Sequence, residues 1–157
     1  MAGKVVEAMA LGRNHAMALV VDLEELRSEL RLSSTDHVPM SDSLRYNTIT
    51  SRQVFVWGMG SQGQLGLCHT NSVQCPTRVE TLQQKRIVEL AAGDHCSAAI
   101  TWNGEVYIWG DNGDCGLGLG SLSGSISTTR KLSFFDVVPI ARVCSLSFSS
   151  PSSLLID

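Results

Sequence analysis

Two similar strings of residues occur in this chain of 157 residues. Residues 54–66 read VFVWGMGSQGQLG, and residues 106–118 read VYIWGDNGDCGLG. Trp57 and Trp109 are 109 − 57 = 52 residues apart, and Leu65 and Leu117 have the same separation. A fixed period of roughly 20–50 residues is the signature of repeat architectures, in which each unit buries its apolar surface against a neighbour. We therefore expect a fold built from repeated units.

A second repeated block locates an insertion. The two copies are AMALGRNHAMALV at 8–20 and ELAAGDHCSAAIT at 89–101. Gly12 and Gly93 are 93 − 12 = 81 residues apart, which exceeds the period of 52 by 29. Between this block and the next Val-aromatic segment the earlier copy has 32 residues, 22–53, whereas the later copy has three, and 32 − 3 = 29. The two offsets agree once residues 22–53 are treated as an insertion.

Short apolar runs between turn-forming residues predict an all-β fold. We expect four strands within one period, at Val54–Trp57, Thr77–Glu80, Ile87–Ala92 and Ser97–Ile100. Asn103-Gly104 between apolar runs is a strong hairpin signal. Apolar residues occupy both sides of the strand at 54–57, so both of its faces should be buried, as in stacked blades. The period near 50 then indicates a partial β-propeller of four-stranded blades, about two to three of them, with a 32-residue inserted loop.

The repeated strings resemble one propeller family. Kelch repeats carry a Gly-Gly pair, which is absent, and Trp-Asp repeats need Asp after a Trp that is here followed by Gly. Trp-Gly-x-Gly-x-x-Gly-Gln-Leu-Gly at 57–66 and Asn-Gly-Glu-Val-Tyr-Ile-Trp-Gly at 103–110 resemble the regulator of chromosome condensation repeat. The resemblance implies a structural role for the motif residues, which are Gly12, His15, Trp57, Gly58, Gly63, Leu65, Gly66, Gly93, Gly104, Trp109, Gly110, Leu117 and Gly118.

The resemblance also suggests how the chain is organised. Complete propellers of this family have seven blades, so residues 1–157 are expected to form an incomplete propeller domain. Its predicted parts are a partial blade at 4–21, the insertion at 22–53, a full repeat at 54–105 and a further, degenerate repeat at 106–157. We expect a fragment or shortened isoform whose missing blades come from the rest of a longer chain or from a partner. Isolated, it should expose apolar blade faces and self-associate.

The insertion is the one long segment outside the repeat. Leu23, Leu26 and Leu30 have helical spacing and predict a short amphipathic helix. The remainder is polar and rich in Ser and Thr. Two interpretations stay open, a solvated connection or a partner-binding or phosphorylated loop, because propeller function usually resides on loops.

Composition excludes several classes of protein. A net charge of −3 and a pI of about 5.8 leave no basic surplus for phosphates, so direct binding of nucleic acid is not expected. No apolar run is long enough to span a membrane. Five cysteines without a C-x-x-C pair argue against a disulfide framework or a zinc site. Free thiols fit a reducing compartment, so we expect an intracellular protein, cytoplasmic or nuclear.

One glycine motif can be interpreted either as a dinucleotide-binding site or as a structural turn. Gly58, Gly60 and Gly63 spell G-x-G-x-x-G after a strand, which is the dinucleotide-binding fingerprint when a helix follows. Here QLGLCHTNS follows, with no amphipathic period, so we expect the glycines to provide positive φ and close backbone approach. His15 is expected to be buried and hydrogen-bonded. We identify no catalytic, cofactor-binding or metal-binding residue.

The family resemblance carries the functional hypothesis. Its founding member is a guanine-nucleotide exchange factor for the small GTPase Ran, and other members are scaffolds or regulators of trafficking GTPases. We expect a non-enzymatic protein-interaction scaffold within a larger regulatory protein, linked to small-GTPase regulation. The alternative is exchange-factor activity on a Ran-like or trafficking GTPase, and a chromatin-binding role ranks third because the chain is slightly acidic.

Overall fold

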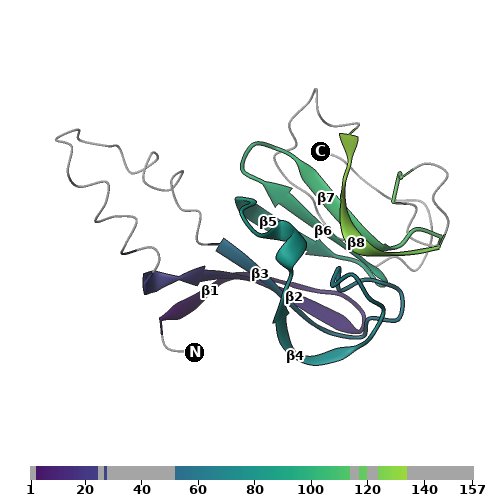
Figure 1. Ribbon diagram of the computed structural model, residues 1–157, viewed down its shortest axis with the longest axis horizontal. Helices are drawn as coiled ribbons and strands as arrows, with labels where there is room; N and C mark the ends of the chain where they lie inside the picture. The colour runs from purple at the N-terminus through teal and green to yellow at the C-terminus, as the bar shows by residue number, and fades with distance from the viewer. Residues whose placement is uncertain (1–2, 25–26, 28–51, 114–116, 120–123, 134–157) are drawn as a thin grey trace.

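The computed structural model describes residues 3–24, 27, 52–113, 117–119 and 124–133, which form two four-stranded antiparallel sheets (Figure 1). The strands of the first sheet are β1 (Lys4–Leu11), β2 (His15–Asp22), β3 (Arg52–Gly58) and β4 (Val73–Arg78). Those of the second are β5 (Ile87–Ala92), β6 (Cys96–Thr101), β7 (Val106–Asp111) and β8 (Ser125–Lys131). Each sheet follows the chain order, so both are meanders. The all-β prediction is confirmed.

The two sheets have the same internal register. In the first, His15 on β2 pairs with Gly58 on β3, and in the second Cys96 on β6 pairs with Gly110 on β7. The β6–β7 hairpin turns at Gly104, which has a φ of 82° and donates its N–H to the Thr101 carbonyl at 2.9 Å. Glycine adopts this φ without strain, and the Asn-Gly hairpin prediction is confirmed.

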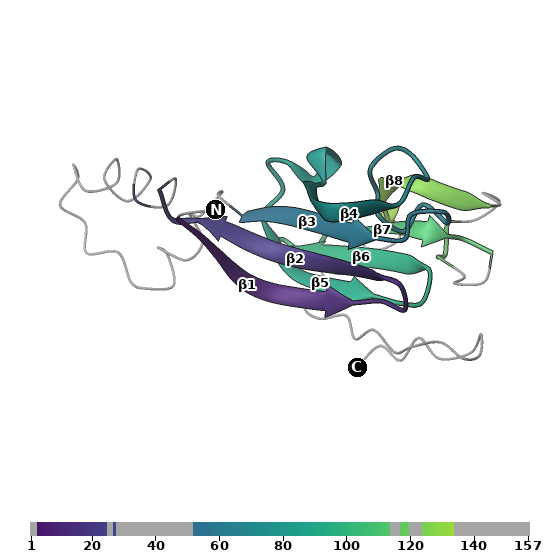
Figure 2. The same cartoon turned by 90° about the horizontal axis from the view of Figure 1, so that it is seen from below.

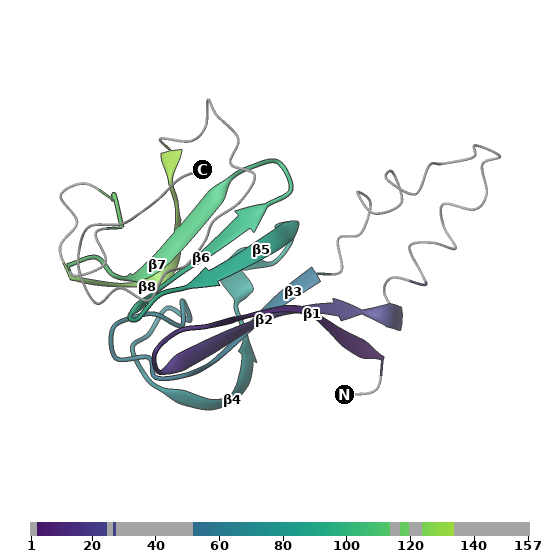
Figure 3. The ribbon, with the colours of Figure 1, turned by 180° about the vertical axis from the view of Figure 1, so that it is seen from behind.

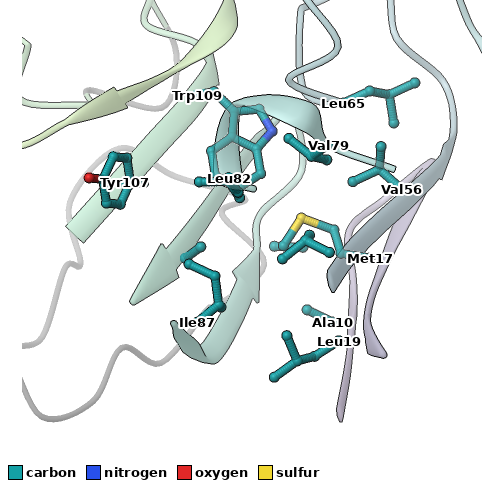
Figure 4. Close-up of a cluster of buried hydrophobic side chains, with 13 residues drawn as sticks. Ala10, Met17, Leu19, Val56, Leu65, Val79, Leu82, Ile87, Tyr107 and Trp109 are labelled. Carbon is teal, nitrogen blue, oxygen red and sulfur yellow. The ribbon is translucent and has the colours of Figure 1, made fainter. Parts of the chain in front are cut away.

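The sheets pack face to face over one apolar core (Figures 2 and 3). The strand β5 lies against β1, β2 and β3. Figure 4 shows side chains from both sheets and from the connections between them converging on this core. Its most deeply buried members are Met17, Leu19, Val56, Leu65, Val79, Ile87, Ala99 and Trp109. Burial of this contact between sheets is the main apolar contribution to the stability of the pair.

The boundaries of the sequence repeat do not coincide with the boundaries of the sheets. The repeat at 54–105 contributes β3 and β4 to the first sheet but β5 and β6 to the second. The segment at 4–21 forms β1 and most of β2, which residues 52–78 complete to four strands. A period read from sequence can be cut at any point, whereas hydrogen bonding between strands decides where a sheet begins.

Two strand predictions were wrong in detail. The strand expected at Thr77–Glu80 is β4, Val73–Arg78, and a 3₁₀ turn, Glu80–Leu82, follows it because Leu82 is buried in the core. Burial of both faces of β3 was also predicted. Val54 and Val56 are 2% and 0% exposed, but Phe55 and Trp57 on the other face are only half-buried, because the second sheet covers one face alone.

The insertion begins and ends inside the strands. The strand β2 extends to Asp22 and β3 begins at Arg52, so the connection runs over 23–51 rather than 22–53. At the predicted helix of Leu23, Leu26 and Leu30, the described residues Leu23, Glu24 and Arg27 are helical. Leu26, Leu30 and most of the degenerate repeat, beyond residue 133, lie outside the described residues. Within the described ranges, no helix has the length and apolar character needed to cross a membrane.

Candidate functional site

The glycine-rich loop after β3 crosses to the second sheet instead of opening a helix. Gly63 donates its N–H to the Gly60 carbonyl at 2.8 Å, and Gly66 donates to the Gly63 carbonyl at 3.0 Å, so two tight turns follow each other. The next regular element is the strand β4, beginning at Val73. A dinucleotide site needs a helix N-terminus after the third glycine to hold the pyrophosphate. This loop lacks it, so the structural interpretation of the glycines holds.

The main-chain carbonyl of Gln64 is the centre of the contact between the sheets. It accepts a hydrogen bond from the indole Nε1 of Trp109 at 2.8 Å and another from the hydroxyl of Ser97 at 2.8 Å. All three residues are at most 2% exposed. Because both lone pairs of this buried carbonyl are used, the loop is fixed to β6 and β7 at the same point.

Gly66 lies directly on the ring of Trp109. Its φ is +66°, and a Cβ built there would lie 2.8 Å from Trp109 Nε1. Only glycine allows both this backbone conformation and this approach. We call the contact of Gly66 and the Gln64 carbonyl with the Trp109 indole the clasp.

The loop also pairs with the outer strand of the second sheet. Leu67 forms an isolated antiparallel bridge with Thr128 on β8, and the N–H of Cys68 donates to the Ser127 carbonyl at 2.8 Å. The Ser125 hydroxyl donates to Gln62 Oε1 at 2.9 Å. The first sheet therefore holds the second at both its centre and its outer edge.

His15 extends this network into the turn between β1 and β2. It is 5% exposed, and its Nε2 lies 2.8 Å from Ser97 Oγ. The Ser97 proton is given to the Gln64 carbonyl, so Nε2 carries a proton and donates to the hydroxyl oxygen. Burial, and secondarily the charge of His95, lower the pKa of His15 from 6.5 to about 4, against the opposing effect of the Cys96 backbone. The ring is neutral at pH 7.

The histidine and serine do not form a nucleophile and its base. Ser97 is 2% exposed, and its proton is committed to a carbonyl rather than to the imidazole. The Nδ1 atom of His15 has no hydrogen-bond partner within the described part of the chain. The predicted buried, hydrogen-bonding role of His15 is confirmed. Nothing in the sequence pattern indicated Ser97 or Gln64 as its companions.

The remaining motif residues occupy turns and core positions. Gly12 and Gly93 close the β1–β2 and β5–β6 turns by donating to the His15 and Cys96 carbonyls, both at 2.9 Å. Gly58 is the last residue of β3, and Gly110 is the last but one of β7, with φ values of 107° and 112°. The other positions are Leu65 and Leu117, which are buried, Trp57, which is half-buried, and Gly118, which is exposed.

A hollow of about 390 Å³ lies beside the start of β3 and the 3₁₀ turn. Two arginines line it, but Arg52 makes two hydrogen bonds of 2.7 Å to the Glu7 carboxylate, and Arg78 bonds the Glu80 carboxylate at 2.8 and 3.0 Å. Their charges are compensated, so the hollow does not attract an anion. Among the described residues no group of His, Cys, Asp or Glu side chains could hold a metal ion.

Stacked four-stranded meanders joined by a glycine-rich loop define adjacent blades of a β-propeller. Residues 53–100 match the regulator of chromosome condensation (RCC1) repeat. The chain is 35% identical over 105 residues to RCC1 domain-containing protein RUG3, mitochondrial, of Arabidopsis thaliana, covering 65% of this chain and 24% of the relative. It is 32% identical over 92 residues to the human probable E3 ubiquitin-protein ligase HERC6, covering 58% and 9%.

Solved structures agree with this fold. Human WBSCR16 superposes with a TM-score of 0.64 at 21% identity, over 92% of this chain and 29% of that one. Prp20p of Saccharomyces cerevisiae superposes with a TM-score of 0.63 at 16% identity, over 94% and 30%. The chain is thus similar to proteins that carry regulator of chromosome condensation repeats, and residues 53–100 match one such repeat. It spans about a quarter of the plant relative and under a third of either solved propeller.

Proposed function

We propose that this chain is a non-enzymatic protein-interaction module of a larger regulatory protein, linked to small-GTPase regulation. The observation that carries the proposal is where the motif residues lie. His15, Gln64, Ser97 and Trp109 are all at most 5% exposed, and their polar groups bond one another across the blade contact. Since the distinctive polar residues hold blades together, recognition is left to surface loops, as is usual for this architecture.

The described surface includes a pair of side chains suited to binding a protein. Trp102, in the β6–β7 turn, is 54% exposed, and the Arg86 guanidinium lies 4.8 Å from the centre of its ring. The main-chain N–H of Trp102 donates to the Arg86 carbonyl at 2.8 Å, which holds the two residues together. Tryptophan and arginine are the residue types most enriched among interface hot spots. We take this Arg86–Trp102 pair as the first contact surface to test.

The similar proteins indicate which partner to try first. Prp20p binds Gsp1p and histones. The chain's net charge of −3 disfavours nucleic acid. We take a Ran-type GTPase as the leading protein partner, because the repeats resemble those of an exchange factor for Ran. The exposed free thiols of Cys68 and Cys75 support a reducing, cytoplasmic or nuclear location.

The test is binding of the purified chain to a Ran-type GTPase loaded with fluorescent GDP. Trp102→Ala should weaken binding about thirty-fold or more, as expected for a hot-spot tryptophan. Met59→Ala is the matched control, because Met59 is also an exposed apolar side chain, at 40%, but lies at the other end of the blade beyond β3. Lack of binding would refute the proposed link to small-GTPase regulation. Equal loss of binding in both variants would refute the Arg86–Trp102 pair as the contact surface.

The same assay separates the alternative, a guanine-nucleotide exchange factor. The similarity to Prp20p, which binds Gsp1p, favours this second candidate. An exchange factor accelerates release of the fluorescent GDP at catalytic concentrations of the chain, whereas a scaffold binds and leaves the release rate unchanged. EDTA, which removes Mg²⁺, provides the reference for full release.

A further inference from the structure

The segment between the 3₁₀ turn and β5 forms a turn whose backbone favours glycine but which carries glutamine. Lys85 donates its main-chain N–H to the Leu82 carbonyl at 3.1 Å. Gln83 has a φ of −58° and a ψ of 140°, and Gln84 has a φ of 65°, which match a type II β-turn with Gln84 in its third position. Glycine or asparagine is usual there, because a positive φ crowds the Cβ of other residues. The glutamine is therefore present at a conformational cost.

Gln84 is also one of the residues that line the hollow beside the start of β3. Gln83, Arg52 and Arg78 line it too, and both guanidiniums are already paired with carboxylates. A side-chain amide both donates and accepts hydrogen bonds and carries no charge. The hollow thus suits an uncharged polar group better than a carboxylate or a phosphate.

Two cations come directly after this turn. The Nζ atom of Lys85 lies 5.4 Å from the centre of the Tyr107 ring, and the Arg86 guanidinium lies 4.8 Å from the centre of the Trp102 ring. Among the residues that the structure describes, neither cation has a carboxylate within ion-pair distance. Both are therefore suited to receive a carboxylate from another molecule.

A nearby acidic side chain does not cancel these charges. Glu105 acts electrostatically on Lys85, but it is paired with Lys131 at 2.7 Å. Among Lys85, Arg86, Lys131 and Glu105 the net charge is 3 − 1 = +2, in a chain whose net charge is −3. This end of the second sheet is locally basic on an acidic chain.

The hollow and the cations form one continuous surface. Gln84 and Arg86 are two residues apart, so their Cα atoms lie within about 8 Å of each other. Trp102, 54% exposed, is bonded to the Arg86 carbonyl through its main-chain N–H. The surface lies at strand ends, beside the start of β3, the start of β5 and the β6–β7 turn, whereas the two blades pack through their sheet faces (Figure 2). We call residues 83–86, Trp102 and the hollow the turn surface.

We propose that the turn surface binds an extended acidic segment of a partner protein. Its carboxylates contact Lys85 and Arg86, one of its side chains covers the Trp102 ring, and an uncharged polar group enters the hollow. Four extended residues span roughly 13 Å, enough to reach from the hollow past Arg86. Two unpaired cations fit a short acidic segment, whereas nucleic acid typically needs about 6–10 phosphate contacts. The inference deepens the proposed function and rests on it for the existence of a protein partner.

Fluorescence anisotropy with the 157-residue chain tests the charge requirement. The probe is a labelled peptide in which Glu and Gln alternate around a central Tyr, and its control has every Glu replaced by Gln. The acidic peptide should bind about tenfold tighter or more, and the difference should shrink as salt screens the charges. Equal binding of the two peptides overturns the proposal. Tighter binding of a single-stranded oligonucleotide with the same number of charges overturns the choice of a protein segment.

Charge-matched variants locate the site. Lys85→Ala and Arg86→Ala should each weaken binding of the acidic peptide about tenfold, the expected cost of losing a hydrogen bond to a charged group. Arg13→Ala is the control, because Arg13 is exposed in the β1–β2 turn, at the opposite end of the first sheet from Arg52. It should bind like the wild type. Equal losses in all three variants would mean that only the overall charge matters, and would overturn the turn surface.

A change at Gln84 separates binding from folding. Glycine is favoured at this turn position, so Gln84→Gly should melt at or above the wild-type temperature, yet bind the acidic peptide several-fold more weakly because the amide is lost. Gln84→Asn, which tolerates positive φ and keeps an amide, should bind more tightly than Gln84→Gly. Wild-type affinity in Gln84→Gly would overturn the assignment of the hollow.

The peptide assay contains no GTPase, so its result is independent of the GTPase link. Binding of the acidic peptide without binding of the GTPase would refute that link and leave the turn surface standing. Conversely, binding of the GTPase that Lys85→Ala and Arg86→Ala leave unchanged would refute the turn surface and leave the link standing.

Discussion

Acid should loosen the contact between the two blades through His15. The neutral ring is buried, 5% exposed, and donates to Ser97, while its Nδ1 faces no described partner. A second proton would place a charge in the core beside His95. Burial and that neighbour lower the pKa of His15 to about 4, from 6.5 in a free histidine.

The sign and size follow from linkage. Below pH 6.5 the unfolded chain binds a proton at this position and the folded chain does not, so stability is complete above 6.5 and is lost as the pH falls to about 4. One pKa unit is worth about 1.4 kcal/mol, so the free energy of unfolding should fall by about 3 kcal/mol across this window. Glu105, whose pKa is lowered by its hydrogen bond to Lys131, adds a loss at more acidic pH.

Chemical denaturation at several pH values, at concentrations where the chain is monomeric, measures this contribution. His15→Gln can still donate to Ser97 but cannot be protonated, so its stability should depend much less on pH between 7 and about 4.5. His69→Gln, which changes an exposed histidine, is the control and should keep the wild-type slope. If His15→Gln retains the wild-type slope, His15 is not the group that couples protons to the blade contact.

Three further changes test the core and the loop. Trp109→Ala should cost about 3–5 kcal/mol in denaturant melts, because the ring is fully buried, and a loss below about 1 kcal/mol would contradict its place in the core. Gly118→Ala should cost roughly 1–2 kcal/mol, from left-handed backbone strain alone. Gly66→Ala should cost more, because its Cβ would also meet the indole of Trp109, and equal losses in the two variants would argue against the clasp. Calorimetry should detect no NAD, FAD or nucleotide at the glycine-rich loop, and micromolar binding abolished by Gly60→Ala would show the structural interpretation to be wrong.

Periodicity in the sequence was enough to predict the type of fold. The recurrence of Trp57 at Trp109, and of Gly12 at Gly93 once the insertion is removed, indicated repeated all-β units. Turn residues such as the Asn103-Gly104 pair carry local conformational preferences, so the hairpin there could be read directly. The strands and turns within each unit depend on neighbouring residues, through turn propensity and the alternation of apolar and polar side chains.

Only the tertiary structure decided where one blade ends and how blades are joined. The repeat at 54–105 is divided between two sheets because strand pairing, which the period does not specify, sets the blade. Ser97 and the Gln64 carbonyl could not be identified from sequence, since a serine and a main-chain oxygen gain their role only when segments 33 residues apart meet. Burial then gives His15 its lowered pKa, whereas Trp57, the counterpart of the fully buried Trp109, is only half-buried. Both depend on what is packed nearby, which the local sequence does not encode.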